Sequence, residues 1–248
     1  MEIDYLMLIS GNDIPFIKGG FVIHQPTLKE IGLIGEENFY TGCELLKFSK
    51  DLLNDEDKNN LIDKTDFDIL MIILQEKNNI SIKSRVCLEM VLTLIFPNYT
   101  FKIEQQNILL YNKEEKFFIN NENFEEFKKY IEEIFCLNQG NQDNFNPSGD
   151  LAKRIAEKLK SRHKKLAQSN QENKGGYLER LISILSVGLS INLHELFNYT
   201  IYQLLDTYRR YDMKINYDMF IEAKLAGAKD LKEVDNWMKN IHSTKEEK

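Results

Sequence analysis

The chain has 248 residues, a formal net charge of −7 at pH 7 and an ordinary hydrophobic content of 42%. Its longest aliphatic run, Ile69–Leu74, is far shorter than the roughly 18 residues of a membrane span, so we expect no integral membrane protein. Three dispersed cysteines argue against a disulfide framework, and four histidines without ligand spacing predict no metal site. The acidic start Met1–Asp4 lacks the basic region of a signal peptide, which favours a cytoplasmic location.

The first 50 residues predict a mixture of strands and helix. The run Ile3–Ile9 is rich in apolar and aromatic residues and predicts a strand, and Phe21–Ile23 predicts another after a glycine pair. Thr27, followed by Glu30 three residues later, forms a capping box that predicts a helix start. That helix extends towards residue 48, and we expect it to break near Gly35, because glycine costs about 1 kcal/mol relative to alanine in a helix interior.

Two stronger helices are predicted next. Thr65 and Asp68 have capping-box spacing ahead of an apolar stretch that ends near residue 74. A second helix is expected to begin at Ser81 and to stop before Pro97, since proline cannot continue a helix. Both segments are apolar over a wide arc, which is typical of helices that pack in a core.

The hydrophobic period changes between residues 99 and 119. Three short β-prone runs, separated by polar turns, predict a three-stranded meander; they are Tyr99–Ile103, Ile108–Tyr111 and Lys116–Ile119. Asn123, with Glu126 at the third helical position, is then expected to cap a further helix.

Composition and charge together predict two domains. Residues 1–137 carry 14 basic and 24 acidic side chains, whereas residues 138–248 carry 18 and 15. The run 138–149, rich in Asn, Gln and Gly, predicts a linker. We therefore expect a mixed α/β domain at 1–137, a helical domain at 150–242 and a disordered tail at 243–248.

A strongly basic amphipathic helix is predicted over residues 151–168. Seven cations face a single acid, Glu157, and we regard them as candidate partner-binding residues: Lys153, Arg154, Lys158, Lys160, Arg162, Lys164 and Lys165. A solvated or protein-facing surface is the preferred interpretation, because no aromatic residue interleaves with the cations as a platform for nucleic-acid bases would need. Binding of phosphates remains the alternative.

Three amphipathic helices are predicted after the polar loop 169–176. The first has an apolar stripe between Leu178 and Leu185, the second runs from Asn192 to Tyr211, and the third follows Asn216 and stops at Gly227. Asp230 and Glu233 would cap a final helical turn. The side chains that we expect in the core of this part are Leu196, Phe197, Ile201, Leu204, Tyr208 and Trp237.

These elements predict an α+β fold that is predominantly helical, with short strands and the meander in the N-terminal part and only helices in the C-terminal part. No nucleotide-binding, nucleophile-elbow or paired-carboxylate pattern occurs, so we expect no catalytic residue, no cofactor and no enzyme activity.

Four stretches of the sequence resemble those of phage and prophage tail assembly chaperones encoded in tail modules. They are residues 24–31 (HQPTLKEI), residues 145–147 (FNP), residues 196–206 (LFNYTIYQLLD) and residues 225–229 (LAGAK) with residues 237–239 (WMK). Their order spans most of the chain.

The resemblance implies a non-enzymatic helper in the bacterial cytoplasm. Such a protein would bind the helical tape-measure protein, keep it soluble and leave as tail tube subunits assemble. A structural tail, baseplate or connector component is the first alternative, and a nucleic-acid-binding adaptor acting through the basic residues of 151–168 is the second. We do not expect a membrane partner, and nucleic acid is the least favoured one.

Overall fold

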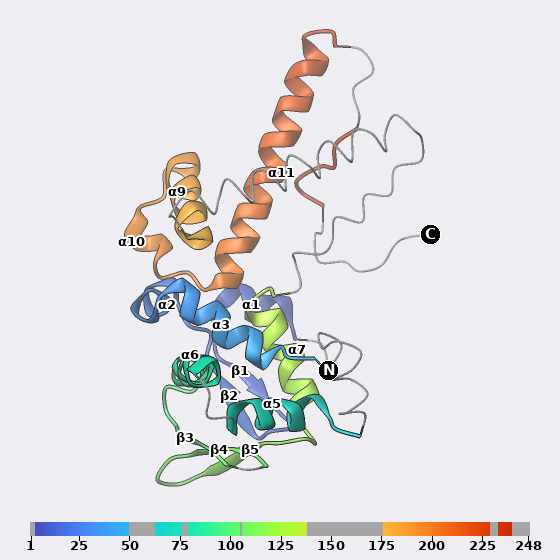
Figure 1. Ribbon diagram of the computed structural model, residues 1–248. Helices are drawn as coiled ribbons and strands as arrows, with labels where there is room; N and C mark the ends of the chain where they lie inside the picture. Colours follow the sequence, from blue (N-terminus) through green and yellow to red (C-terminus); the bar gives the residue numbers. More distant parts are fainter. Residues whose placement is uncertain are drawn as a thin grey trace.

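The computed structural model describes residues 3–49, 63–75, 79–104, 106–137, 176–228 and 233–239. Within these ranges the protein is an α+β structure with strands only in its N-terminal part and only helices in its C-terminal part, as predicted. Figure 1 shows a lower body that holds both small sheets and a set of upper helices, one of which rises well away from the body. The linker 138–149, the basic residues of 151–168 and the tail 243–248 lie outside the described residues, so the domain boundaries stay a prediction.

The chain opens with a helix rather than a strand. Helix α1 spans Tyr5–Ser10, begins at Asp4, whose side chain accepts a hydrogen bond from the Leu6 N–H, and ends at Gly11 with a φ of 71°. The prediction of a strand over Ile3–Ile9 was wrong, because capping at both ends closes a turn of helix in a stretch whose composition favours strand. Strands β1 (Ile14–Phe16) and β2 (Phe21–Ile23) follow as an antiparallel hairpin.

Glycine 35 divides the next helical stretch as expected. Helix α2 (Leu28–Ile34) begins at the capping box of Thr27 and Glu30, and α3 (Glu36–Leu46) follows directly. Gly35 takes a φ of 84°, which a side chain would make costly. The predicted capping box and the predicted break are both confirmed.

The remaining body elements follow the predicted order. Helix α5 spans Asp66–Gln75, and α6 spans Asn79–Ile95, two residues longer at its start than predicted. The meander is confirmed as β3 (Thr100–Ile103), β4 (Ile108–Tyr111) and β5 (Lys116–Ile119), paired antiparallel in that order.

Helix α7 spans Phe124–Ile134 and closes the body, but its predicted cap works differently. The Asn123 side chain makes no hydrogen bond to this helix. Instead its oxygen accepts a hydrogen bond from the Asn120 N–H, and its amide donates one to the Phe118 carbonyl. The residue fixes the turn between the meander and α7 rather than the helix itself.

Aromatic side chains fill the centre of the body. Phe16 and Phe21 of the hairpin contact Phe127 of α7, with ring centroids 5.9 and 6.2 Å apart, respectively. Helix α3 packs closely on α6 because Gly42 has no side chain; a Cβ there would lie 2.6 Å from the Cys87 carbonyl oxygen. The strands and helices of the body therefore share one hydrophobic core.

The upper helices divide differently from the prediction. Helix α9 spans Tyr177–Leu189, α10 is a short helix at Leu193–Leu196, and α11 runs without interruption from Ile201 to Leu225. The predicted helix from Asn192 to Tyr211 is thus broken after Leu196, and the separate helix after Asn216 is the distal half of α11. The break arises because Thr200 and Gln203 form a second capping box, which starts α11 afresh.

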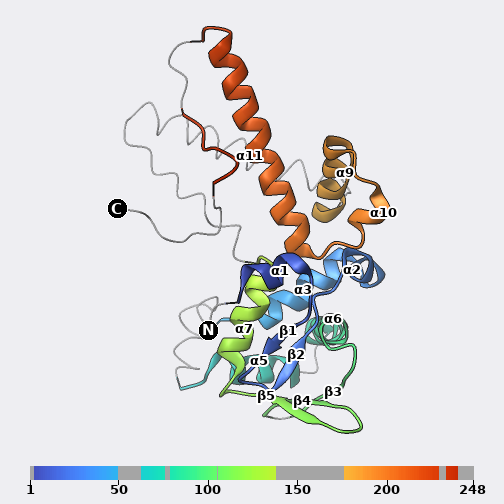
Figure 2. The same cartoon turned by 180° about the vertical axis from the view of Figure 1, so that it is seen from behind.

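The upper helices pack on the body through apolar residues. Leu178, Leu181, Ile182 and Leu185 of α9, with Leu196, Ile201 and Leu204, belong to the same buried cluster as the body core. Figure 2 shows the opposite view, in which the base of α11 stands on α1 and α2. No helix in the described ranges has both the length and the hydrophobicity needed to cross a lipid bilayer.

Candidate functional site

Two of the sequence stretches singled out above, residues 24–31 and 196–206, meet in space. We call their contact, together with the adjoining ends of α1, α3 and α9, the junction. Thr27 and Thr200 form an isolated antiparallel β-bridge. The Leu28 N–H donates to the Tyr199 carbonyl at 2.8 Å, and the Lys29 N–H donates to the Phe197 carbonyl at 2.9 Å. The loop between α10 and α11 is thereby tied to the first turn of α2.

These bonds satisfy backbone N–H groups at the start of helix α2. The first N–H groups of any helix lack partners inside that helix. Here Leu28 and Lys29 find carbonyls of the 197–199 loop, while the third, Glu30, donates to Thr27 Oγ1 at 3.3 Å. The N-terminus of α2 therefore supplies the donors that hold the upper helices.

Gln203 links the base of α11 to α1. Its Oε1 accepts a hydrogen bond from the Thr200 N–H at 2.8 Å, and its Nε2 donates to the Ile9 carbonyl at 2.7 Å. That carbonyl belongs to the last turn of α1, where carbonyl oxygens have no N–H partner within the helix. One side chain thus satisfies the start of α11 and the end of α1.

Glu36 makes the third contact of the junction, at the start of α9. Its Oε1 accepts a hydrogen bond from the Leu178 N–H at 3.1 Å, which places a carboxylate at a helix N-terminus. Gly176 leaves the space for it, since a Cβ there would lie 2.0 Å from Glu36 Oε2. The junction therefore connects α9 to α3, and the base of α11 to α1 and α2.

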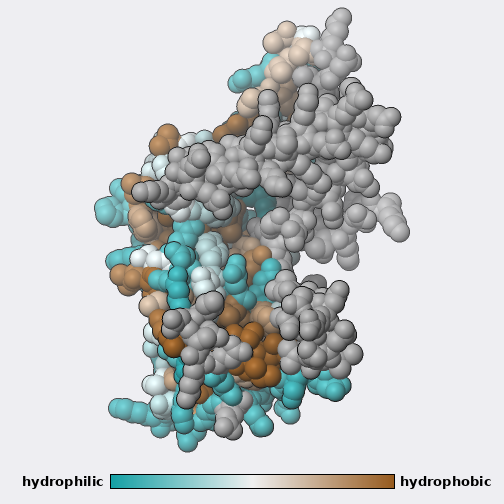
Figure 3. Space-filling view, in the orientation of Figure 1, coloured by the Kyte–Doolittle hydropathy of each residue, from teal (hydrophilic) through white to brown (hydrophobic). Residues whose placement is uncertain are grey.

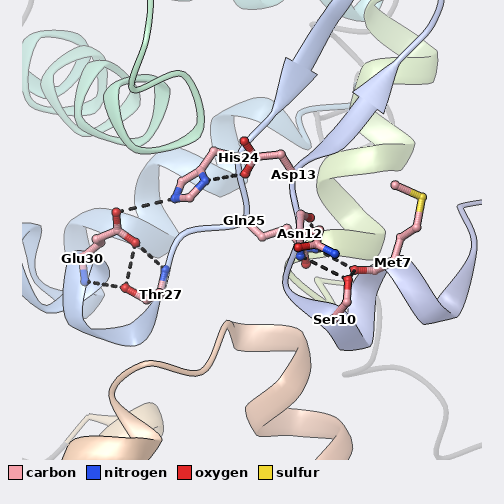
Figure 4. Close-up of polar contacts among 8 residues, drawn as sticks. All are labelled: Met7, Ser10, Asn12, Asp13, His24, Gln25, Thr27 and Glu30. Carbon is pink, nitrogen blue, oxygen red and sulfur yellow. Dashed lines mark hydrogen bonds and ion pairs between the residues drawn. The ribbon is translucent and has the colours of Figure 1, made fainter.

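A polar network supports the α2 side of the junction, as Figure 4 shows. His24 lies between two carboxylates: its Nδ1 is 2.7 Å from Asp13 Oδ1, and its Nε2 is 3.5 Å from Glu30 Oε1. Glu30 Oε2 also accepts hydrogen bonds from the N–H and the hydroxyl of Thr27, each at 2.7 Å. Both ring nitrogens of His24 thus face carboxylate oxygens, one before β1 and one in α2.

The neighbours of Glu30 favour its ionised form. Burial opposes its ionisation, but hydrogen bonds from Thr27 and the nearby His24 outweigh that cost and lower the pKa of Glu30 below its ordinary 4.5. Gln25, which follows His24 in the chain, is almost fully buried and donates through Nε2 to the carbonyls of Met7 and Asn12. The turn before α2 is thus fixed on both sides.

Three titratable side chains beside the junction have pKa values that burial raises. Burial raises the pKa of the Cys136 thiol to about 12. Burial and then Asp206 raise the pKa of Tyr202, and burial and then Glu36 raise that of Tyr40. Of these three side chains, Tyr202 is buried, whereas Tyr40 and Cys136 are partly buried.

The predicted core residues of the upper helices have different positions. Leu196, Ile201 and Leu204 are buried, with exposed fractions of 0, 1 and 0%. Tyr208 packs against the core but is only partly buried, and Trp237 is likewise intermediate. Phe197 is 39% exposed, contrary to prediction, because it lies in the turn after α10 rather than on a helix face.

The final helical turn predicted to follow Asp230 lies partly outside the described residues, and its described part, 233–239, contains no helix. Residues 233–239 have no regular structure, and the Trp237 carbonyl accepts a hydrogen bond from Arg210 of α11. The sequence signal for the junction was visible in Thr200-x-x-Gln203, which has capping-box spacing, but the apolar stripe across it favoured one continuous helix. Contacts such as Gln203 to Ile9 join residues far apart in the chain and have no local signal.

Apolar side chains also reach the surface of the upper helices. Figure 3 shows hydrophobic (brown) surface at several points of this part. The large exposed residues of α9, α10 and α11 are Tyr177, Ile184, Val187, Leu189, Leu193, Ile215, Met219 and Leu225. Val187 and Leu225 are each 82% exposed. Nowhere in the described ranges do three or more His, Cys, Asp or Glu side chains gather as metal ligands would.

Comparison with known proteins gives a partial similarity. Residues 169–242 match the family model described as the YomV second domain, a phage-derived family. Neither a curated protein nor a solved structure matches the chain. The matched region contains α9, α10, α11 and the segment 233–239, and the match points to a phage or prophage protein.

Proposed function

We propose that this protein is a non-enzymatic phage tail assembly chaperone that binds the tape-measure protein through its upper helices. The proposal rests on the match of α9, α10 and α11 to a phage-derived domain, together with the apolar side chains that these helices expose above a fixed base; the body exposes apolar side chains as well. A long helical client exposes apolar helix faces before assembly, and a helix-in-groove contact would cover them.

The geometry of the junction supports a binding role. It fixes the base of α11 through bonds to α1 and α2, so that the shaft of this helix stands away from the body (Figure 1). Isolated helices are marginal in water, and a helix that projects needs either its own packing or a partner. The basic residues Lys153–Lys165 would add a second contact for acidic faces of the client.

Co-expression with the tape-measure protein of the same phage tests the proposal. The soluble yield of the tape-measure protein should rise, the two proteins should co-purify, and purified particles should lack this protein. Stoichiometric copies in purified particles, without a tape-measure complex in lysates, would instead identify a structural tail component. A salt-sensitive shift with DNA or RNA would favour the nucleic-acid adaptor.

Matched variants locate the contact. Val187→Asp, on α9, should reduce co-purification, whereas Leu33→Asp, on α2, should not, although Val187 and Leu33 are 82 and 83% exposed. Neither change should move the melting temperature much, because surface substitutions usually alter stability by less than about 0.5 kcal/mol. Charge reversal at Lys158, Arg162 and Lys165 should weaken capture and its salt dependence.

A further inference from the structure

The distal half of α11 carries an apolar face, and a later part of the same chain hydrogen-bonds to Arg210 at the near end of that face. The residues of α11 that are fully buried, Ile201, Tyr202 and Leu204, all belong to its first turn. The segment 233–239 lies beside the middle of the helix, and it is the red stretch next to the α11 label in Figure 1. Beyond Leu204, the helix is therefore at most partly buried, and the segment contacts it at Arg210.

Helical spacing defines the face. Arg210, Met213, Tyr217 and Phe220 stand three, four and three residues apart, so they share one side of α11. Each of these four side chains is partly buried. Met219, which points to another side, is 62% exposed. One face is thus shielded while its neighbour is open.

Arg210 fixes the segment against this face. Its Nη1 donates to the Trp237 carbonyl at 2.8 Å and to the Lys239 carbonyl at 2.6 Å. Asn236 shapes the segment as a turn, because its Oδ1 accepts from the Met238 N–H and its carbonyl accepts from the Lys239 N–H. Two backbone carbonyls are thereby presented to one guanidinium group.

We propose that segment 233–239 is a displaceable strap over the face formed by Met213, Tyr217 and Phe220, and that an amphipathic partner helix takes its place. The partner helix carries a carboxylate beside its apolar stripe, since Arg210 loses two acceptors when the strap leaves and a carboxylate restores them. The identity of the partner rests on the function proposed above, whereas the existence of the strap is argued from the contacts of Arg210 alone.

Several features make the strap removable. It has no helix or strand, and its Trp237 is only partly buried. Its bonds to Arg210 use backbone carbonyls, which water or a partner can replace at little cost. The strap keeps an apolar face covered until the client arrives, and so limits self-association of the free protein.

Trp237 is the single tryptophan of the chain, so its fluorescence reports the strap directly. In the full-length protein, Arg210→Ala should shift the emission to the red and raise the acrylamide quenching constant towards that of N-acetyl-tryptophanamide. Arg209→Ala, at the neighbouring position, should leave both values at the wild-type level. Identical emission and quenching in wild type and Arg210→Ala would overturn the strap.

Co-expression with the tape-measure protein tests the partner half. Phe220→Asp should abolish co-purification, whereas Met219→Asp, on the open side of the same helix, should retain it. Bound client should also raise the quenching of Trp237 in the wild-type protein. If Phe220→Asp and Met219→Asp lose co-purification equally, or if neither loses it, the assignment of this face is overturned. If the wild type captures no client, the proposed function fails, and the fluorescence result alone still decides the strap.

Discussion

The two ends of α11 are held in opposite ways. At its base, Ile201 and Leu204 are 1 and 0% exposed, and Thr200 and Gln203 bond to other elements. Beyond Leu204 none of its residues is fully buried, and Arg210 fastens a segment without regular structure. The difference teaches that one helix can be anchored in the core at one end and remain only partly covered at the other.

The largest effect should come from cutting into the anchored end. Leu204→Ala removes a fully buried side chain and should lower the free energy of unfolding by about 2–5 kcal/mol. Met219→Ala, in the distal half, should change it by less than about 0.5 kcal/mol. Urea denaturation of both variants measures the contrast, and similar losses would mean that the two ends do not differ.

A second test concerns the packing of α9 against α11. A Cβ on Gly188 would lie 2.1 Å from the Tyr211 hydroxyl oxygen, so Gly188→Ala should destabilise the protein by about 1–3 kcal/mol. Gly32 of α2 has open space around it, and Gly32→Ala should instead stabilise by about 0.5–1 kcal/mol. Thermal unfolding followed by circular dichroism compares the two variants. Melting temperatures that change in the same direction in both would contradict this view of the contact between α9 and α11.

The third test loosens the junction itself. Thr27→Ala removes the cap of α2 and should cost about 0.5–2 kcal/mol. Hydrogen exchange of the Leu28 and Lys29 amides, which donate to the 197–199 loop, should accelerate. Thr65→Ala, which removes the corresponding capping residue ahead of α5, should leave those two amides as protected as in the wild type.

The smallest effect is expected from acid. The pKa of Glu30 lies below its ordinary 4.5 in the folded protein, so its carboxylate stabilises the fold above that pH. This contribution is lost as the pH falls through the folded pKa, and Glu30→Gln lacks it throughout. The melting temperatures of wild type and variant should therefore converge as the pH falls from 4.5 through the lower pKa that Glu30 has in the folded protein. A constant difference across the pH range would show that the charge of Glu30 contributes nothing.

The sequence by itself determined the elements whose signals are local. The Thr27–Glu30 box, the glycine at 35 and the β-prone runs between 99 and 119 each specify a start, a break or a strand through their immediate neighbours. The order of the body elements and the helical character of the C-terminal part follow from such signals. The buried positions of Leu196, Ile201 and Leu204 follow from helical periodicity in the same way.

Only the tertiary structure decided what holds the base of α11. The apolar stripe from Asn192 to Tyr211 continues across the break, so periodicity could not place the boundary that the Thr200–Gln203 capping box sets, and bonds from Thr27, Leu28 and Lys29 hold this boundary against α2. The strap depends on Arg210 reaching carbonyls 27 and 29 residues later, and backbone acceptors leave no trace in side-chain patterns. Contacts of this kind depend on distance in space, which a sequence does not carry.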